Sequence, residues 1–234
     1  MEVAELWRYP VKSLGGEQMD EAEVTPSGLV GDRRYAIFDA TTGLGMTARR
    51  APEMLFARAR WRDDGAVQIT LPDGRVSRGD DDLSDWLGRP VMLRAANQVR
   101  VRMYEATSDP DEDESTWSVF SGASGAFHDS GRAKVTLVSR GTLGEWDRRR
   151  FRANVVLTGD GEDDLVDRAA RMGDVELRVT KRIDRCVMVT RPQPDGVSLD
   201  RDVLRAIHRE RGGCLAVGAL VTQPGIVRLG DPVT

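Results

Sequence analysis

Short apolar or alternating segments, separated at close intervals by glycine and proline, run through most of this chain of 234 residues. Segments this short between turn-forming residues are typical of β-strands and leave little room for long helices. In the first half, strands are expected at residues 4–9, 21–24, 34–38, 55–60, 67–71 and 91–94. A short helix is predicted at residues 81–87, because acidic residues begin it and Gly88 follows it.

The second half continues in the same way with more helix. Strands are expected at residues 133–139, 154–158, 175–181, 187–190, 216–221 and 226–229, and helices near 142–149, at 163–170 and at 198–211. The last helix is the clearest, because Val203, Leu204 and Ile207 share one face and Gly212 can end it. The sequence has no regular strand–helix alternation and no glycine-rich phosphate loop. It therefore predicts a mainly β (α+β) architecture with a few short helices, and not a Rossmann fold.

An acidic, turn-rich segment with almost no apolar residues, residues 105–118, lies between the two halves. A solvated loop is the simplest interpretation of such a composition. A flexible lid or an acidic docking surface is the functional alternative, and the sequence leaves both open.

Charge and composition argue against several classes of function. The formal net charge is −4 and no basic run with interleaved aromatic residues occurs, so nucleic-acid binding is not expected. No apolar run is long enough to span a membrane and no signal peptide is recognisable, which predicts a cytoplasmic protein without a membrane partner. The two cysteines cannot form a disulfide framework, and no CxxC or HxxxH spacing indicates zinc. If a metal is bound, the protein alone does not supply all its ligands.

Arginine dominates the basic residues, since only three of the 34 are lysines. Codon bias explains such an excess, but the fixed donor fork of arginine also suits phosphate or another anion. Basic and polar residues recur beside the predicted strand ends, at Lys12 and Ser13, at Arg33, at Arg49, and at Arg152 with Asn154. Each of these sites is ordinary as a solvated turn. Together they would suit one anionic ligand held between the two halves.

Cys186 lies where a polar stretch gives way to an apolar one, in company with Lys181, Arg182 and Arg185. A lone cysteine entering an apolar segment is usually part of a core. Neighbouring cations, however, stabilise a thiolate, and a thiolate suits a soft metal or a sulfur-bearing anionic cofactor. His128 and Asp129 are a second candidate pair, although adjacency in sequence does not put both side chains on one face.

Several of these segments, taken in order, resemble the MOSC-domain family, which is named after the C-terminal domain of molybdenum cofactor sulfurase and includes the mitochondrial amidoxime-reducing component. The most specific matches are Tyr9-Pro-Val-Lys-Ser13, Arg150-Phe-Arg-Ala-Asn154 and Arg185-Cys186. Segments 28–35, 46–49, 127–129, 173–177 and 225–231 also match, so the resemblance covers essentially the whole chain.

The resemblance implies two β-barrel-like domains, an N-terminal β-barrel domain at residues 1–95 and a MOSC domain at residues 96–234. It implies a molybdenum cofactor, a molybdopterin, whose metal is ligated by the thiolate of Cys186, with Asp129 nearby as a second catalytic residue. The positions that match the family's cofactor contacts are Lys12, Ser13, Arg33, Arg152 and Arg185, with Arg49 and Asn154 as weaker matches. The implied reaction is the two-electron reduction of an N–O bond in a small N-hydroxylated compound, with Asp129 or His128 as the proton relay.

The resemblance also bears on the electron donor, on an alternative function and on access of the substrate. The electrons would come from a separate ferredoxin- or cytochrome-type donor protein. The main alternative to an oxidoreductase is a carrier that holds the molybdenum cofactor, or a persulfide on Cys186, without turning over a substrate. Residues 190–196 differ from the turn found in many relatives, which would alter access of the substrate.

Overall fold

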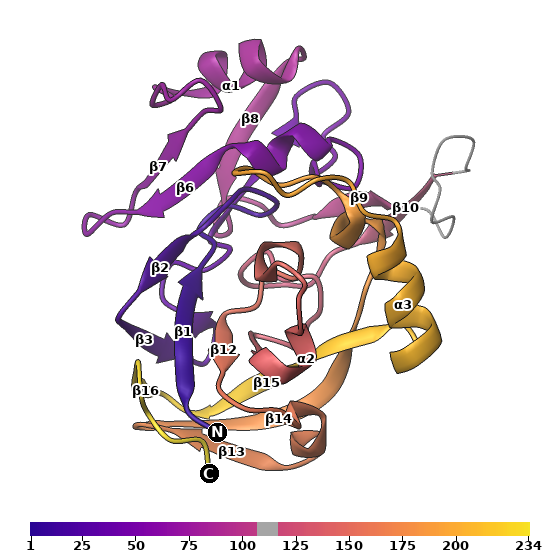
Figure 1. Ribbon diagram of the computed structural model, residues 1–234. Coiled ribbons are helices and arrows are strands. Elements are labelled where there is room, and N and C mark those ends of the chain that lie inside the picture. The colour runs from indigo at the N-terminus through magenta and orange to yellow at the C-terminus, as the bar shows by residue number, and fades with distance from the viewer. Residues whose placement is uncertain (107–116) are drawn as a thin grey trace.

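Strands dominate the computed structural model, which describes residues 1–106 and 117–234 (Figure 1). The predicted mainly β architecture is confirmed. Figure 1 shows β6 (Arg58–Trp61), β7 (Val67–Thr70), β8 (Val91–Ala95) and the helix α1 (Asp80–Leu87) gathered at one end of the molecule and the largest sheet at the other. The acidic segment falls mostly on residues 107–116, outside the described residues, so its interpretation as a solvated loop stays a prediction.

The largest sheet has seven strands in the order β13-β14-β15-β11-β12-β1-β2. All its neighbours are antiparallel except β11 and β12, which are parallel. The strands are β1 (Val3–Arg8), β2 (Glu17–Met19), β11 (Val135–Ser139), β12 (Val155–Leu157), β13 (Ala169–Met172), β14 (Val175–Asp184) and β15 (Cys214–Gln223). The N-terminal strand β1 thus lies inside a sheet built mainly by the second half of the chain, while the predicted boundary at residue 95 stays a prediction.

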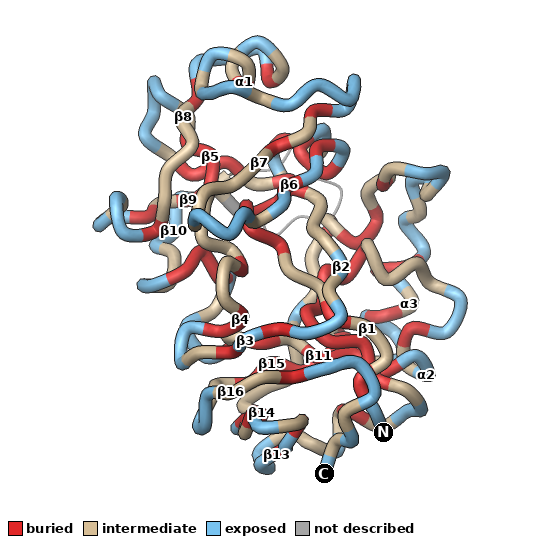
Figure 2. Tube along the Cα trace, turned by 90° about the vertical axis from the view of Figure 1, so that its left-hand side faces the viewer, coloured by how far each residue is buried: buried red, intermediate tan, exposed pale blue. Residues whose placement is uncertain are grey.

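A three-stranded sheet shares one core with this large sheet. It consists of β16 (Gly225–Arg228), β3 (Glu21–Thr25) and β4 (Gly28–Leu29) in that order. Alternate side chains point inward, as Ala22 and Val24 do in β3, and pack against Leu6 and Leu177 of the large sheet. In Figure 2 the buried residues gather along β1, β11 and β15, where this core lies.

The other end of the molecule is built from antiparallel pairs of strands around a second core. The pairs are β5 (Tyr35–Asp39) with β8 (Val91–Ala95), β6 (Arg58–Trp61) with β7 (Val67–Thr70), and β9 (Met103–Ala106) with β10 (Ser118–Ser121). The helix α1 (Asp80–Leu87) covers this core with Leu83 and Leu87 and ends at Gly88, whose φ of 65° lies in the left-handed region.

The other two α-helices and three of the 3-10 helices are short and belong to the second half. They are α2 (Arg140–Leu143), α3 (Asp202–Arg211) and the 3-10 helices η2 (Arg148–Arg150), η3 (Glu162–Leu165) and η4 (Val187–Thr190). As expected, α3 buries Val203, Leu204 and Ile207 and ends at Gly212 with a φ of 62°. It begins at Asp202, four residues later than the predicted start.

The predicted strand at residues 187–190 is wrong, because these residues form η4. A short apolar run has no periodicity that separates a strand from a buried turn of helix. Here the hydroxyl of Thr190 donates to the carbonyl of Val187 at 2.8 Å and the N–H of Val189 donates to the carbonyl of Cys186 at 3.1 Å, which closes the turn.

Two other predicted elements are divided in the structure. The expected helix at residues 163–170 is η3 followed by β13, and Asp167 between them has a φ of 63°, which a continuing helix does not allow. The expected strand at residues 55–60 begins only at Arg58, because Pro52 starts the 3-10 helix η1 (Pro52–Phe56) before it.

Candidate functional site

A cavity of about 250 Å³ lies where the loops after β1 and before β5 meet η2, the end of β14 and the start of η4. The structure brings most of the predicted site residues to its walls. Those that line it are Lys12, Ser13, Arg33, Arg49, Asp129, Arg152, Arg185 and Cys186. Of the site residues predicted from the sequence, only Asn154 does not line the cavity.

Three of these residues have unusual backbone conformations. Among the described non-glycine residues, six have a positive φ, and Ser13 (69°), Arg33 (49°) and Arg152 (53°) are three of them. Such a conformation costs about 1–3 kcal/mol per residue and persists only where the surrounding structure enforces it. The backbone is therefore held in a strained conformation at three positions of the cavity lining.

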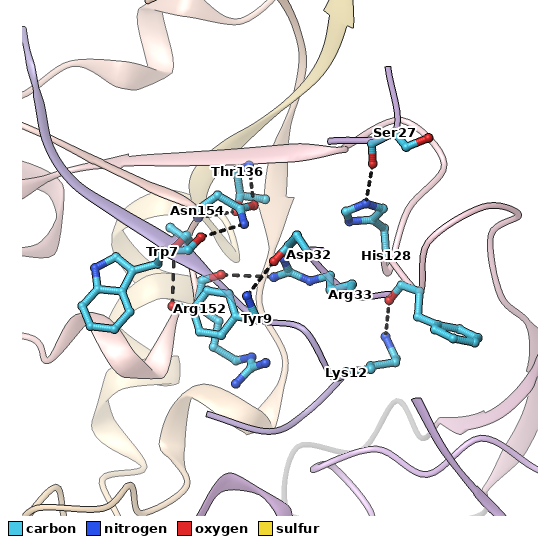
Figure 3. A network of polar contacts seen from close by, with 12 residues as sticks. Trp7, Tyr9, Lys12, Ser27, Asp32, Arg33, His128, Thr136, Arg152 and Asn154 are labelled. Atoms are coloured by element: carbon cyan, nitrogen blue, oxygen red, sulfur yellow. Dashed lines mark hydrogen bonds and ion pairs between the residues drawn. The ribbon is translucent and has the colours of Figure 1, made fainter. Parts of the chain in front are cut away.

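Lys12 and Asp129 form an ion pair across the cavity. Lys12 is buried, and its ammonium donates to Asp129 Oδ1. It also donates at 3.4 Å to the carbonyl of Phe127, a contact drawn in Figure 3. The carboxylate of Asp129 is open to the cavity. Confinement alone would raise the pKa of Asp129, but Lys12, followed by Arg33 and Arg152, outweighs it and holds the pKa well below its usual range. Asp129 is therefore ionised at neutral pH and pairs with Lys12 as a carboxylate.

A buried network fixes the two arginines on the opposite side of this pair (Figure 3). Asp32, only 3% exposed, accepts hydrogen bonds from the Tyr9 N–H at 2.8 Å and from the guanidinium of Arg33. Arg33 also donates to the carbonyl of Arg152 at 3.2 Å, and Arg152 donates to the carbonyl of Leu14 at 2.5 Å. Burial lowers the pKa of Arg152 to about 10, so it remains a cation at neutral pH.

Arg185 places an unpartnered donor beside the cysteine. Its Nε donates to the carbonyl of Leu215 at 2.8 Å and its Nη1 to the carbonyl of Phe151 at 3.0 Å. Its Nη2 is buried and has no partner among the described residues. Burial, partly opposed by the neighbouring Cys186, lowers the pKa of Arg185 to about 10. Cys186 is a half-buried free thiol.

Asn154 performs a structural role in this arrangement. It is fully buried, its Oδ1 accepts from the N–H and hydroxyl of Thr136 at 3.2 and 3.0 Å, and its Nδ2 donates to the carbonyl of Trp7 at 3.2 Å (Figure 3). These contacts tie β1 to β11 directly behind the cavity. A role of Asn154 in holding a ligand stays a prediction.

Replacing Asn154 by alanine is expected to lower the free energy of unfolding by about 1–3 kcal/mol, because it leaves buried polar groups on Trp7 and Thr136 unpaired. Urea unfolding measures the change. The exposed Asn97, the other asparagine of the chain, provides the control, and its alanine variant should stay within about 0.5 kcal/mol. Equal effects of the two variants would contradict this role.

His128 lines the cavity but is buried in its wall. Its Nε2 lies 3.1 Å from the carbonyl oxygen of Ser27, an acceptor, so the neutral ring donates there. Burial lowers the pKa of His128 to about 4. At neutral pH, the imidazole is uncharged and its Nε2 proton is engaged, which favours the Lys12–Asp129 pair over His128 as the group that handles protons.

This depressed pKa predicts a specific dependence of stability on pH. Between pH 6.5 and pH 4 the unfolded chain binds a proton at His128 that the folded protein does not, so acidification should cost roughly 2–3 kcal/mol of folding free energy over this window. His128→Gln, which keeps a donor for Ser27, should lose less stability over the same range in urea unfolding. Identical losses in both proteins would disprove this account.

Sequence reasoning missed several lining residues. Tyr104 and Phe120 reach the cavity from β9 and β10. No local pattern marks them, since they become neighbours only through strand pairing. Arg150, also missed, lines the cavity and uses its guanidinium to hold the segment around η4, donating to the carbonyls of Val189, Arg191 and Ser198.

The lining as a whole is cationic. It carries Lys12, Arg33, Arg49, Arg150, Arg152, Lys181 and Arg185 but only the carboxylates of Asp129 and Asp184. Such a cavity attracts an anion, and its arginine donors suit phosphate in particular. No group of three or more histidine, cysteine or acidic side chains that could hold a metal occurs among the described residues. A metal at Cys186 would therefore need further ligands from a bound cofactor.

Comparison with known proteins identifies related sequences over the whole chain. Residues 1–117 match the family described as MOSC N-terminal beta barrel domain, and residues 122–234 match the MOSC domain. Mitochondrial amidoxime-reducing component 1 of Mus musculus is 24% identical, covering 99% of this chain and 81% of that protein. Mitochondrial amidoxime reducing component 2 of Bos taurus is also 24% identical, covering 99% and 82%.

Solved structures show weaker likeness. The YuaD protein of Bacillus subtilis aligns over 99% of this chain and 93% of its own, with 12% identity and a TM-score of 0.45. A score at this level adds nothing to the sequence comparison.

Within the described residues, no helix is long and apolar enough to cross a membrane.

Proposed function

Because this chain belongs to the MOSC-domain family, we propose that it binds a molybdenum cofactor in the cavity around Cys186 and reduces N-hydroxylated compounds there. The relatives named amidoxime-reducing components support a reductase of this kind. The main support for the proposal is that one cationic cavity is lined by both Cys186, a free thiol, and Arg185, whose buried Nη2 has no hydrogen-bond partner among the described residues.

The residues present fit such a cofactor. A thiolate is a soft ligand and suits molybdenum, and Lys12, Arg33 and Arg152 offer the cations that a cofactor phosphate requires. The Nη2 of Arg185 lacks a partner that a bound anionic or carbonyl group would supply. In this proposal Cys186 ligates the metal, while Lys12, Ser13, Arg33, Arg49, Arg152 and Arg185 hold the organic part.

When bound, the cofactor would supply the two electrons that break the N–O bond. The chain itself would supply orientation and protons. Asp129, ionised by Lys12, can accept a hydrogen bond from an N–H or O–H of the substrate through its carboxylate. The Nζ of Lys12, which donates to this carboxylate, would also donate to the oxygen that leaves as water. The electrons come, in this proposal, from a separate ferredoxin- or cytochrome-type protein.

A cytoplasmic setting belongs to the same proposal. Both cysteines, Cys186 and Cys214, are free thiols, as a reducing compartment would keep them.

The proposal is tested on protein purified from a host that makes the cofactor. Molybdenum per chain is measured by elemental mass spectrometry, and amidine formation from an amidoxime is followed with a chemically reduced viologen as electron donor. About one molybdenum per chain together with turnover supports a reductase. Molybdenum without turnover supports the carrier alternative, and a folded protein without molybdenum contradicts both.

A further inference from the structure

A second cavity, of about 410 Å³, adjoins the cavity around Cys186 and has no part in the proposed function. Arg152 is the only described residue that lines both cavities. The other walls of the second cavity come from β1 and the loop after it, from η1 and β6, and from η2 and the turn after η4. Small-molecule sites usually have volumes of about 300–1,000 Å³, so a small organic molecule fits here.

The turn after η4 forms one wall of the second cavity and is held by two arginines. Asp195 in this turn has a φ of 59° and pairs with Arg149 at 3.2 Å and with Arg58 at 2.6 Å. Arg149 also donates to the carbonyl of Pro194 at 2.7 Å. Because Arg58 belongs to β6 and Arg149 to η2, the turn is tied to both ends of the molecule. The wall is therefore formed before any ligand binds.

Gln193, in the same turn, brings a side-chain amide to the second cavity. The residue is 6% exposed, and its backbone N–H donates to the carbonyl of Val197 at 2.9 Å. Its side-chain amide makes no hydrogen bond within the part of the chain that the structure describes, and neither of its polar atoms is closed off from solvent. A buried amide without a partner is unfavourable. A molecule in the cavity can reach both its donor and its acceptor.

Arg152 brings a buried cation with free donors to the same cavity. It is 9% exposed, and among the described residues its guanidinium donates only to the carbonyl of Leu14, through Nη1 at 2.5 Å. The guanidinium lies 4.4 Å from the centre of the Tyr9 ring, beside which Figure 3 shows it. Its Nε and Nη2 therefore remain available to an anion.

Arg148 provides a second guanidinium with free donors. It lies over the ring of Trp7, 3.4 Å from the ring centre, and its Nε pairs with Glu5 at 2.8 Å. Glu5 also pairs with Arg140 at 3.7 Å, so one carboxylate is shared by two cations. The terminal nitrogens of Arg148 make no hydrogen bond to the described residues, and stacking on Trp7 fixes their plane.

The charge of the second cavity suits a doubly charged anion. Its lining carries four arginines and two aspartates, which gives a net charge of +2. The two aspartates, Asp147 and Asp195, pair with Arg149 and Arg58. The excess charge thus resides on Arg148 and Arg152, whose donor forks match the oxygens of a phosphate monoester.

The remaining lining suits a flat organic group attached to the phosphate. Trp7, Tyr9, Leu55 and Pro194 supply apolar contacts. The amide of Gln193 offers one donor and one acceptor side by side, the pattern with which a glutamine pairs with the edge of adenine.

We propose that the second cavity binds a nucleoside monophosphate, whose phosphate receives hydrogen bonds from Arg148 and Arg152 and whose base pairs with the side-chain amide of Gln193. The inference goes beyond the proposed function, because Arg148 and Gln193 do not line the cavity around Cys186.

The first test is a calorimetric titration with adenosine monophosphate, adenosine and inorganic phosphate. The protein is purified both from a host that makes the molybdenum cofactor and from one that does not. Adenosine monophosphate should bind at least about 10-fold more tightly than either fragment, because only it makes both sets of contacts. Its affinity should be the same for both preparations. Binding no tighter than that of phosphate, or no binding at all, would overturn the inference.

The second test locates the bound nucleotide. Arg148→Gln should weaken adenosine monophosphate about 10-fold and Gln193→Leu about 5-fold. Arg140→Gln is the matched control, because Arg140 pairs with the same Glu5 outside the second cavity. Lys181→Gln removes a cation that lines only the cavity around Cys186. Both controls should stay within about 2-fold of wild type. A loss in Lys181→Gln without a loss in Arg148→Gln would place the phosphate in the other cavity and contradict the inference.

Thermal unfolding without ligand separates loss of binding from loss of structure. Gln193→Leu removes an amide that makes no hydrogen bond, so this variant should unfold at or above the wild-type temperature. A lower temperature would mean that the amide has a partner in the protein, and its assignment to the base would be wrong.

The two preparations also separate this inference from the proposed function. If neither contains molybdenum, the proposed function fails, while the titrations still decide whether the second cavity binds the nucleotide. If adenosine monophosphate binds only to the molybdenum-free protein, the second cavity is an extension of the cofactor site and the inference is wrong.

Discussion

Cys186→Ser is expected to reduce amidoxime turnover at least about 100-fold and to remove most of the bound molybdenum, while the protein stays folded. Loss of residues that merely support a metal ligand typically costs about 10–100-fold in affinity or activity, so loss of the ligand itself should exceed that range. Serine keeps the shape of cysteine but offers a harder, protonated oxygen in place of a soft thiolate. Elemental analysis and viologen-linked turnover measure the two effects.

Cys214→Ser is the matched control for this prediction. Cys214 is the other cysteine of the chain; its thiol donates to Asp184 at 3.5 Å, and it does not line the cavity. This variant should retain at least about half of the molybdenum and activity, in keeping with the small effects of substitutions away from a site. Equal losses in the two variants would show that Cys186 has no special function.

Asp32→Ala is expected to destabilise the protein by about 3–5 kcal/mol, which is the usual cost of removing one partner of a buried ion pair. The carboxylate of Asp32 is fully buried, accepts from the Tyr9 N–H and is the ion-pair partner of Arg33. Without it, the Tyr9 N–H and the guanidinium of Arg33 lose their partner, and Arg152 stands nearby as a second buried cation. Urea unfolding at neutral pH measures the loss.

Asp202→Ala serves as the comparison, because it removes an exposed carboxylate instead of a buried one. Asp202 pairs with Arg205 at 3.0 Å on the surface of α3, where its side chain is 84% exposed. Exposed pairs contribute about 0–1 kcal/mol. A small effect of Asp32→Ala, similar to that of Asp202→Ala, would mean that the buried arginines do not depend on Asp32.

Much of the secondary structure was predictable because local sequence patterns determine it. Alternating burial marks β3, and the apolar face with a following glycine marks α3. The run at residues 187–190 carries no such signal, since four apolar or β-branched residues fit a strand and a buried helical turn alike. Which one forms was decided by tertiary contacts, here the packing of η4 against α3.

That the candidate residues meet in one cavity was predictable from motifs but not from composition or periodicity. The resemblance brought together Lys12, Arg152 and Cys186, which lie far apart in the sequence and line one cavity. It also assigned Asn154 to the cofactor, although that side chain is occupied by Thr136 and Trp7. Tyr104 was missed because it comes to the cavity through the pairing of β9 with β10, which no local sequence pattern shows.

The position of β1 between β12 and β2 has a consequence for how the protein is made. Val3 pairs with Leu157, and the carbonyl of Met1 accepts a hydrogen bond from the N–H of Val233 at 2.9 Å. One edge of β1 pairs with the nearby β2, but the other edge must wait for β12 and for the segment around Val233, which are far along the chain. Pairings of such long sequence separation slow folding. Until they form, the unpaired edge of β1 is a place where unfolded chains can associate.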